Sequence, residues 1–136
     1  MKQTVTLPVV SLLTLILLTI HLTHDVILQA AGAVSYPIPV FVFALWLYGT
    51  LVLSDRVAGY IIMLLGGLFG AAMIVVHAKD LVVGKSGGFL FVWTQFALST
   101  TGIVTTILSA HGLWTTLRSR RATHRVSASW SPATEQ

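Results

Sequence analysis

The sequence contains no cysteine, and this absence removes several kinds of site at once. Disulfide bonds, thiolate zinc sites, iron–sulfur clusters and cysteine nucleophiles all require a thiol. The chain also lacks a phosphate-binding glycine loop, a Gly-x-Ser-x-Gly nucleophile elbow and a His-Glu-x-x-His zinc motif. Because no set of residues combines a nucleophile, a base and oxyanion donors, we expect a binding or accessory protein rather than an enzyme.

Charged residues are also scarce. Asp, Glu, Lys and Arg make up 9% of the 136 residues, whereas soluble domains contain about 25%. Four stretches without any of these residues are longer than the ~20 residues that a helix needs to cross hydrocarbon: 3–24, 26–54, 57–78 and 86–117. The sequence therefore predicts an integral membrane protein of the all-α class.

The predicted membrane segments are separated by turn and breaker residues. We expect an antiparallel bundle of four transmembrane helices at residues 5–30, 39–53, 57–79 and 89–117. Pro39 suits the first turn of a helix, and either Ser54 or Asp55 can cap the third helix. The first apolar stretch exceeds the about 7–15 residues usual in a signal peptide, so we interpret it as a membrane segment.

The positions of the basic residues predict the orientation of the bundle. Six of the eight lie on the side that holds both termini: Lys2, Arg56, Arg118, Arg120, Arg121 and Arg125. The positive-inside rule then places both termini in the cytoplasm, N-in and C-in, with Tyr60 and Trp114 at the inner interface. The expected location is a bacterial inner membrane.

The residues beyond the transmembrane domain of residues 1–117 form a basic tail. We expect residues 118–136 to be disordered and to contact anionic lipid headgroups through Arg118, Arg120, Arg121 and Arg125. The lipid bilayer therefore explains the basic character of the chain, and nucleic acid is not an expected partner.

Polar and small residues repeat along three predicted helices at the spacing of packed membrane helices. The rows are Ser11, Thr14, Leu18, His21 and Asp25; Gly59, Met63, Gly66, Gly70, Met73, His77 and Asp80; and Gln95, Ser99, Gly102, Thr106 and Ser109. Such residues mark the faces where helices meet in lipid, so we predict that these three rows face one another. The Gly66 and Gly70 pair fits packing inside the bundle or dimerisation of two chains, and Gly102 lies in the facing row.

Histidine and aspartate gather at the outer ends of the first and third predicted helices. The candidate ligands there are His21, His24, Asp25, Met73, His77 and Asp80. Within each helix the spacing of three or four residues places His and Asp on one face. Ionisable groups inside a membrane are candidates for function, so we treat this cluster as the candidate site.

Several interpretations of the cluster stay open on the sequence alone. Imidazoles and carboxylates can bind a transition metal ion such as Zn²⁺, and His21 with His77 can supply the axial ligands of haem b. Either cofactor would make the chain a small binding or accessory subunit, as a homo-oligomer or within a larger membrane complex. The alternatives are a proton or cation relay continuing along Gln95, Ser99 and Thr106, and a purely structural subunit with His–Asp hydrogen bonds.

Overall fold

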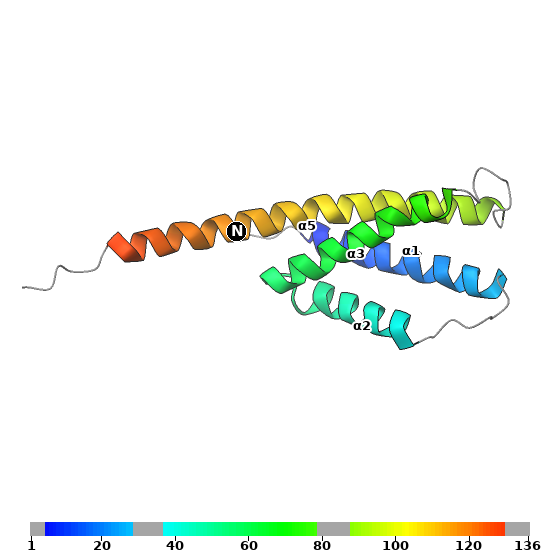
Figure 1. Ribbon diagram of the computed structural model, residues 1–136, viewed down its shortest axis with the longest axis horizontal. Coiled ribbons are helices and arrows are strands. Elements are labelled where there is room, and N and C mark those ends of the chain that lie inside the picture. The colour runs from blue at the N-terminus through cyan, green and yellow to red at the C-terminus, as the bar shows by residue number, and fades with distance from the viewer. Residues whose placement is uncertain (1–4, 29–36, 79–87, 130–136) are drawn as a thin grey trace, which may run out of the picture.

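The computed structural model describes residues 5–28, 37–78 and 88–129, with side chains for residues 5–23, 40–78 and 88–122. It contains the four helices α1 (Thr6–Leu28), α2 (Pro37–Leu51), α3 (Val57–Val76) and α5 (Phe89–Ser129) (Figure 1). The predicted all-helical fold class is therefore confirmed. Pro37 is the first residue of α2, which suits proline because the first helical N–H has no partner within the helix.

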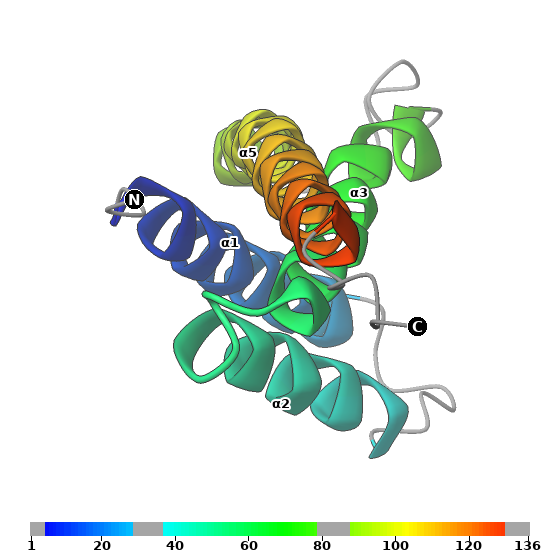
Figure 2. The same cartoon turned by 90° about the vertical axis from the view of Figure 1, so that its left-hand side faces the viewer.

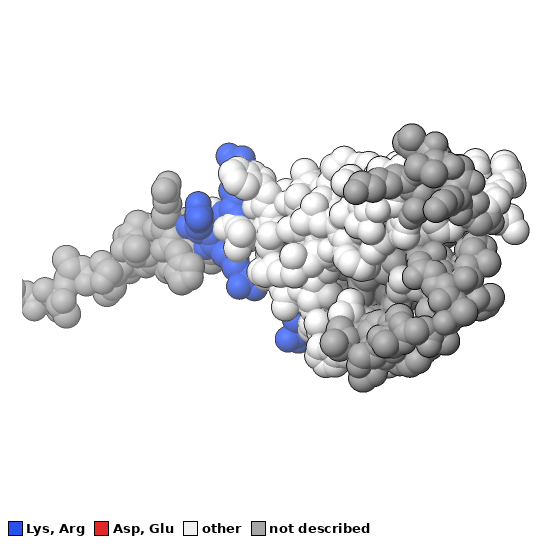
Figure 3. Space-filling model, turned by 45° about the vertical axis from the view of Figure 1, so that its right-hand side comes forward, with Lys and Arg blue, Asp and Glu red and all other residues white. Residues whose placement is uncertain are grey.

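Successive helices run in opposite directions, and this alternation defines two ends of the molecule (Figures 1 and 2). The start of α1 and the turn between α2 and α3 lie at the same end, where α5 passes them and continues well beyond. We call this the arginine end, because it holds Arg56, Arg118, Arg120 and Arg121, and Figure 3 shows Lys and Arg side chains gathered there. We call the opposite end the histidine end, because His21 and His77 lie there.

Three of the helices are long and apolar enough to cross a membrane. The qualifying segments are Thr6–Thr23, Val57–Val76 and Phe89–Ala122, and large apolar side chains such as Ile16, Phe69 and Ile107 are exposed on them. Exposed apolar surface of this extent is typical of a surface that faces lipid. Helix α2 has only 15 residues, about 22 Å at 1.5 Å per residue, and is shorter than the hydrocarbon thickness of ~30 Å.

Helix α5 is much longer than the predicted fourth segment. It continues beyond Leu117 to Ser129, so the expectation of a disordered tail beginning at Arg118 is wrong as far as Ser129. The sequence contains neither glycine nor proline between Gly112 and Pro132, and alanine and arginine favour helix. Composition alone predicted disorder because it did not take account of this uninterrupted helix-compatible stretch.

The start of α3 also differs from the prediction. The residue before the helix is Arg56, whose backbone is extended (φ −107°, ψ 152°) and whose side chain makes no capping hydrogen bond. Ser54 and Asp55 lie earlier in the turn, which the Arg56 N–H closes by donating to the Leu53 carbonyl at 2.8 Å. The N-cap residue of α3 is therefore Arg56, one residue after the predicted Asp55 and two after the predicted Ser54.

Helices α3 and α5 make the most extensive contact in the fold, and glycines allow it. A Cβ atom placed on Gly102 would lie 2.5 Å from the Ala71 nitrogen and 2.8 Å from the Gly67 carbonyl oxygen, so the two backbones touch there. Gly70 lies on the same contact, whereas Gly66 packs against the indole of Trp46 on α2. The GxxxG pair is thus used for packing inside the bundle.

Two apolar clusters fill the space between the helices. One takes a single residue from each helix, namely Leu18, Trp46, Met73 and Leu98, and we call it the apolar layer. The other contains Leu7, Tyr60 and Met63 near the arginine end. Tyr60 is only 1% exposed, and its ring packs directly against Gly112 of α5, so it belongs to the core at this end.

Candidate functional site at the histidine end

The two histidines of the predicted cluster meet in the fold. His21 comes from α1 and is fully buried, and His77 is the half-buried residue that follows α3. Their ring centres are 5.0 Å apart and the ring planes make an angle of 79°. Residues 56 positions apart in the sequence are therefore brought together by the crossing of α1 and α3.

Phe91 of α5 completes this contact. Its ring centre is 5.1 Å from that of His21 and 5.5 Å from that of His77, so the three rings form one cluster. Gly88, with a φ of +86° that other residues rarely adopt, precedes α5 and lets the chain turn into the helix one turn before Phe91. The sequence prediction missed Phe91, which looked like one of many lipid-facing aromatic residues.

Local backbone geometry positions His77. Its N–H donates to the Met73 carbonyl at 3.1 Å, which ends the regular hydrogen bonding of α3. With φ −94° and ψ 7°, His77 lies in the bridge region of backbone space, just outside helical geometry. The imidazole is therefore held by the helix end and by the two neighbouring rings.

Two polar side chains of α5 lie on the turns that follow Phe91. Gln95 is fully buried, and neither atom of its amide group has a hydrogen-bond partner among the described residues. The buried Ser99 hydroxyl likewise has none in that part of the chain. Other α5 hydroxyls do find partners: side chains that donate to a carbonyl three or four residues earlier are Thr94, Thr101, Thr106, Thr115 and Thr116.

Met73 is buried one helical turn before His77. Its side chain packs in the apolar layer with Leu18, Trp46 and Leu98, on the side of the histidines that faces the middle of the bundle. This layer includes a residue from every helix, so it separates the histidine end from the polar groups nearer the arginine end. The thioether predicted as a soft ligand therefore packs as a core side chain.

A hydroxyl network lies on the other side of the apolar layer. Ser11 of α1 and Thr50 of α2 share a hydrogen bond of 2.8 Å, and Trp46 Nε1 donates to the Ser11 hydroxyl at 3.0 Å. Thr14 of α1 shares a 3.0 Å hydrogen bond with Thr105 of α5. The sequence prediction placed Thr106 in the inward row of this helix instead of Thr105. Thr106 is half-buried, and its hydroxyl bonds to its own helix.

The sequence prediction assigned no inward face to α2, and so it missed Trp46 and Thr50. Both are buried, and they lie four residues apart on one face of the helix. That spacing was the available signal, but the uniformly apolar residues around them hid it.

The described residues supply two imidazole ligands. No group of three His, Asp, Glu or Cys side chains that could hold a metal ion occurs among them. The predicted ligands Asp80, Asp25 and His24 lie outside the described residues or side chains, as does Arg125 in the basic segment. Of the predicted His and Asp ligands, the structure describes the side chains of His21 and His77.

The separation of the two rings can be set beside the spacing that each predicted cofactor needs. Two imidazoles bound to one tetrahedral ion have ring centres about 5 Å apart, because metal–nitrogen bonds are about 2.0–2.1 Å long. Axial ligands on opposite faces of haem need about 6 Å or more, with the porphyrin between them. The observed 5.0 Å lies near the first value, and it is also the separation of two rings in an ordinary edge-to-face contact.

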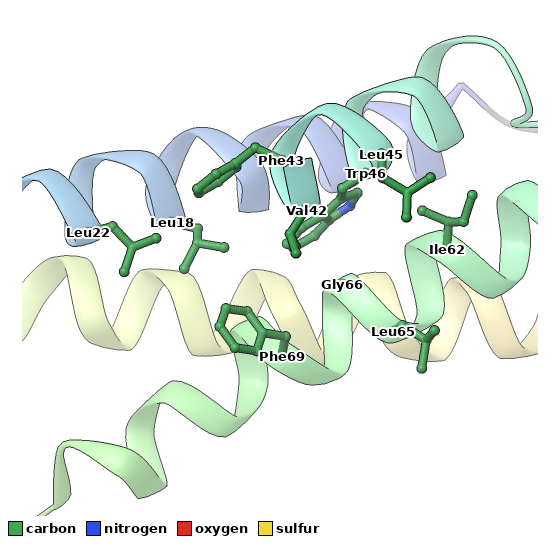
Figure 4. Close-up of a pocket in the computed structure, with 10 residues that line it drawn as sticks. All are labelled: Leu18, Leu22, Val42, Phe43, Leu45, Trp46, Ile62, Leu65, Gly66 and Phe69. Atoms are coloured by element: carbon green, nitrogen blue, oxygen red, sulfur yellow. The ribbon is translucent and has the colours of Figure 1, made fainter. Parts of the chain in front are cut away.

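An apolar cavity of about 480 Å³ lies between α1, α2 and α3 (Figure 4). Its walls include Phe43, Phe69 and Trp46, whose indole N–H already donates to Ser11. None of these three wall residues offers a ligand a free polar group. The cavity is therefore not a candidate for the metal site.

No protein-family model, curated protein or solved structure matches this chain.

Proposed function

We propose that this chain is a small integral membrane binding protein that holds a transition metal ion of the Zn²⁺ or copper class between His21 and His77. The observation that supports this proposal is the 5.0 Å separation of two imidazole rings from different helices. Imidazole is a common ligand for these ions, and burial of His21 provides an environment in which a bound ion exchanges little with bulk water.

Binding agrees better with the architecture than conduction through the bundle. A relay from the histidines to the arginine end would have to pass the apolar layer. On the α3 side it would also meet the backbone contact between Gly102 and Gly67. These two features support a site that opens toward the histidine end only.

The proposal includes a membrane orientation. With the bundle inserted in a bacterial inner membrane N-in and C-in, the arginine end faces the cytoplasm, where positive residues and anionic headgroups favour it. Arg118, Arg120 and Arg121 are exposed on α5 directly beyond its apolar part, as headgroup contact requires. The histidine end then faces outward, so the ion would arrive from outside the cell.

Titration of the purified protein with Zn²⁺ tests the metal site. The full chain is prepared in detergent through a tag without histidine, stripped with a chelator and titrated. We expect about one ion per chain, and an affinity at least ~100-fold weaker in His21→Ala and His77→Ala, since even supporting residues around a metal contribute 10–100-fold. Elemental analysis of the untreated protein identifies the natural ion.

His111→Ala is the matched control, because His111 is an exposed histidine of α5 outside the ring cluster. It should bind Zn²⁺ like the original chain. Circular dichroism of each variant shows whether the helices persist. A folded original chain that binds no stoichiometric Zn²⁺ or copper would leave His21 and His77 as a structural contact and refute the proposal.

A further inference from the structure

The apolar cavity between α1, α2 and α3 has a buried floor and an exposed rim (Figure 4). Its floor includes Leu18 and Trp46, which are 1% and 2% exposed, so the cavity reaches the core of the bundle. Its rim includes Val42 of α2 and Leu65 of α3, which are 44% and 60% exposed. The cavity therefore connects the core to the apolar surface that faces lipid.

The way Trp46 is held keeps this cavity open. The indole N–H donates to the Ser11 hydroxyl at 3.0 Å, which fixes the ring on the α1 side. On the α3 side, a Cβ atom on Gly66 would overlap the indole, so the ring lies directly against the backbone of α3. Trp46 cannot turn into the cavity without losing its hydrogen bond. An occupant therefore has to supply the van der Waals contacts that the walls lack.

The walls restrict the chemistry of that occupant. Of the ten wall residues, only Trp46 has a nitrogen or oxygen atom in its side chain, and its N–H is already bonded. A quinone carbonyl, a sterol hydroxyl or a carboxylate inside the cavity would find no hydrogen bond from these side chains, and such a group is costly to bury. The part of the ligand inside the cavity is therefore pure hydrocarbon.

The volume of the cavity restricts the size of the occupant. An apolar protein cavity of about 150 Å³ binds benzene, which has six carbon atoms. In the same proportion, the cavity volume of about 480 Å³ holds roughly 18 carbon atoms. This is about the number of carbon atoms in one acyl chain of a membrane phospholipid.

We infer that the cavity binds one acyl chain of a bilayer phospholipid, which enters past Val42 and Leu65 and lies against Trp46. Phospholipid is the most abundant ligand available to a rim that is continuous with the lipid-facing surface. Its headgroup can stay at the membrane interface while the uncharged chain occupies uncharged walls. The inference goes beyond the metal site and shares only the membrane setting with the proposed function.

Lipid analysis of the purified chain tests the site. The full chain is washed in mild detergent until no more lipid is released, and the retained lipid is extracted and identified by mass spectrometry. We expect about one phospholipid per chain, and about 10-fold less in Val42→Trp and Leu22→Trp, because the larger side chain overfills the cavity. Val40→Trp is the matched control and should retain the lipid, because Val40 is exposed on the same helix but is not a wall residue.

Fluorescence quenching tests whether the acyl chain lies at Trp46. In a chain with Trp93→Phe, Trp114→Phe and Trp130→Phe, Trp46 is the remaining tryptophan. A phospholipid brominated in the middle of its acyl chains is added to the delipidated protein in detergent. We expect quenching that saturates near one lipid per chain. Quenching that rises in proportion to the lipid without saturating would indicate surface lipid only and overturn the inference.

The remaining outcomes separate this site from the metal site. A chain that retains no phospholipid, that retains it equally in both cavity-filling variants while circular dichroism shows them folded, or that retains an isoprenoid instead would refute the acyl-chain site. His21→Ala should keep the phospholipid while it loses Zn²⁺, so failure of the metal site leaves the acyl-chain site standing. A chain without lipid that still binds Zn²⁺ would refute the acyl-chain site alone.

Discussion

At the scale of single residues, Trp46 shows how a polar group is accommodated in an apolar core. Its indole donates to Ser11, Ser11 shares a hydrogen bond with Thr50, and the Thr50 hydroxyl returns to the Trp46 carbonyl at 2.9 Å. The three side chains satisfy one another without water. Because they link α1 to α2, they fix the short helix α2 against the rest of the bundle.

Ser11→Ala should therefore destabilise the bundle. The change removes the acceptor of the Trp46 indole and one partner of Thr50, which we expect to cost about 1–2 kcal/mol. Thermal unfolding followed by Trp fluorescence measures the loss. Thr19→Val is the control, because the Thr19 hydroxyl is exposed and bonds to its own helix. Equal stability of the two variants would contradict the structural role of Ser11.

Much of the residue pattern could be predicted from the sequence. The row Ser11, Thr14, Leu18 and His21 is buried throughout, because a helix face that is polar in a lipid environment has to turn inward. Spacing alone could not predict which groups on facing helices would pair. Thr105 rather than Thr106 meets Thr14, since the rotation of α5 depends on the glycine contact with α3.

At the scale of helices, the contact between α3 and α5 depends on missing side chains. Gly102 leaves no room for a Cβ against Ala71 and Gly67, so the backbones approach more closely than ordinary packing allows. Close approach of this kind is how small residues hold membrane helices together in the absence of a hydrophobic driving force.

Gly102→Val should separate α3 from α5. The added side chain would overlap backbone atoms, which cannot move aside as a flexible side chain can, and we expect a loss of more than about 3 kcal/mol or failure to fold. Unfolding in a graded detergent mixture measures the effect. Ala110→Val, at an exposed position two turns further along α5, should have little effect. A Gly102→Val protein of ordinary stability would contradict the observed contact.

Helix existence was predictable and helix length was not. Apolar runs predicted all four helices, because each run must satisfy its backbone groups internally in lipid. The change to polar residues at Arg118 did not mark the end of α5, because helix geometry tolerates polar residues and no glycine or proline follows Gly112 within the helix. The alternation of direction followed from short connections such as the turn before Arg56.

At the scale of the whole molecule, charge and histidine lie at opposite ends. The described arginines lie at the end that holds the α2–α3 turn, and His21 with His77 lies at the other (Figures 1 and 3). An asymmetric distribution of this kind is what the positive-inside rule uses to orient a bundle.

Reporter fusions test the orientation. We expect a reporter after Gln136 to be active only in the cytoplasm, and one inserted at residues 81–86 to be active only outside. Replacing Arg118, Arg120 and Arg121 together with Gln should increase the inverted population, because it removes positive charge from one side. Periplasmic activity of the Gln136 fusion in the original chain would refute the orientation. A triple Asn change at Thr94, Thr100 and Thr101 is the control for the triple Gln change, because it replaces three residues of α5 without changing the charge.

The length of α5 has a mechanical consequence. Phe91 at the histidine pair and Arg118 at the opposite end belong to one continuous helix, 27 residues and about 40 Å apart. An α-helix resists compression and twisting over such a length, so the two ends of α5 are mechanically coupled. If α5 rotates about its axis so that the Phe91 ring turns away from the histidines, the arginines on α5 turn by the same angle. The two ends of the helix therefore cannot rotate independently.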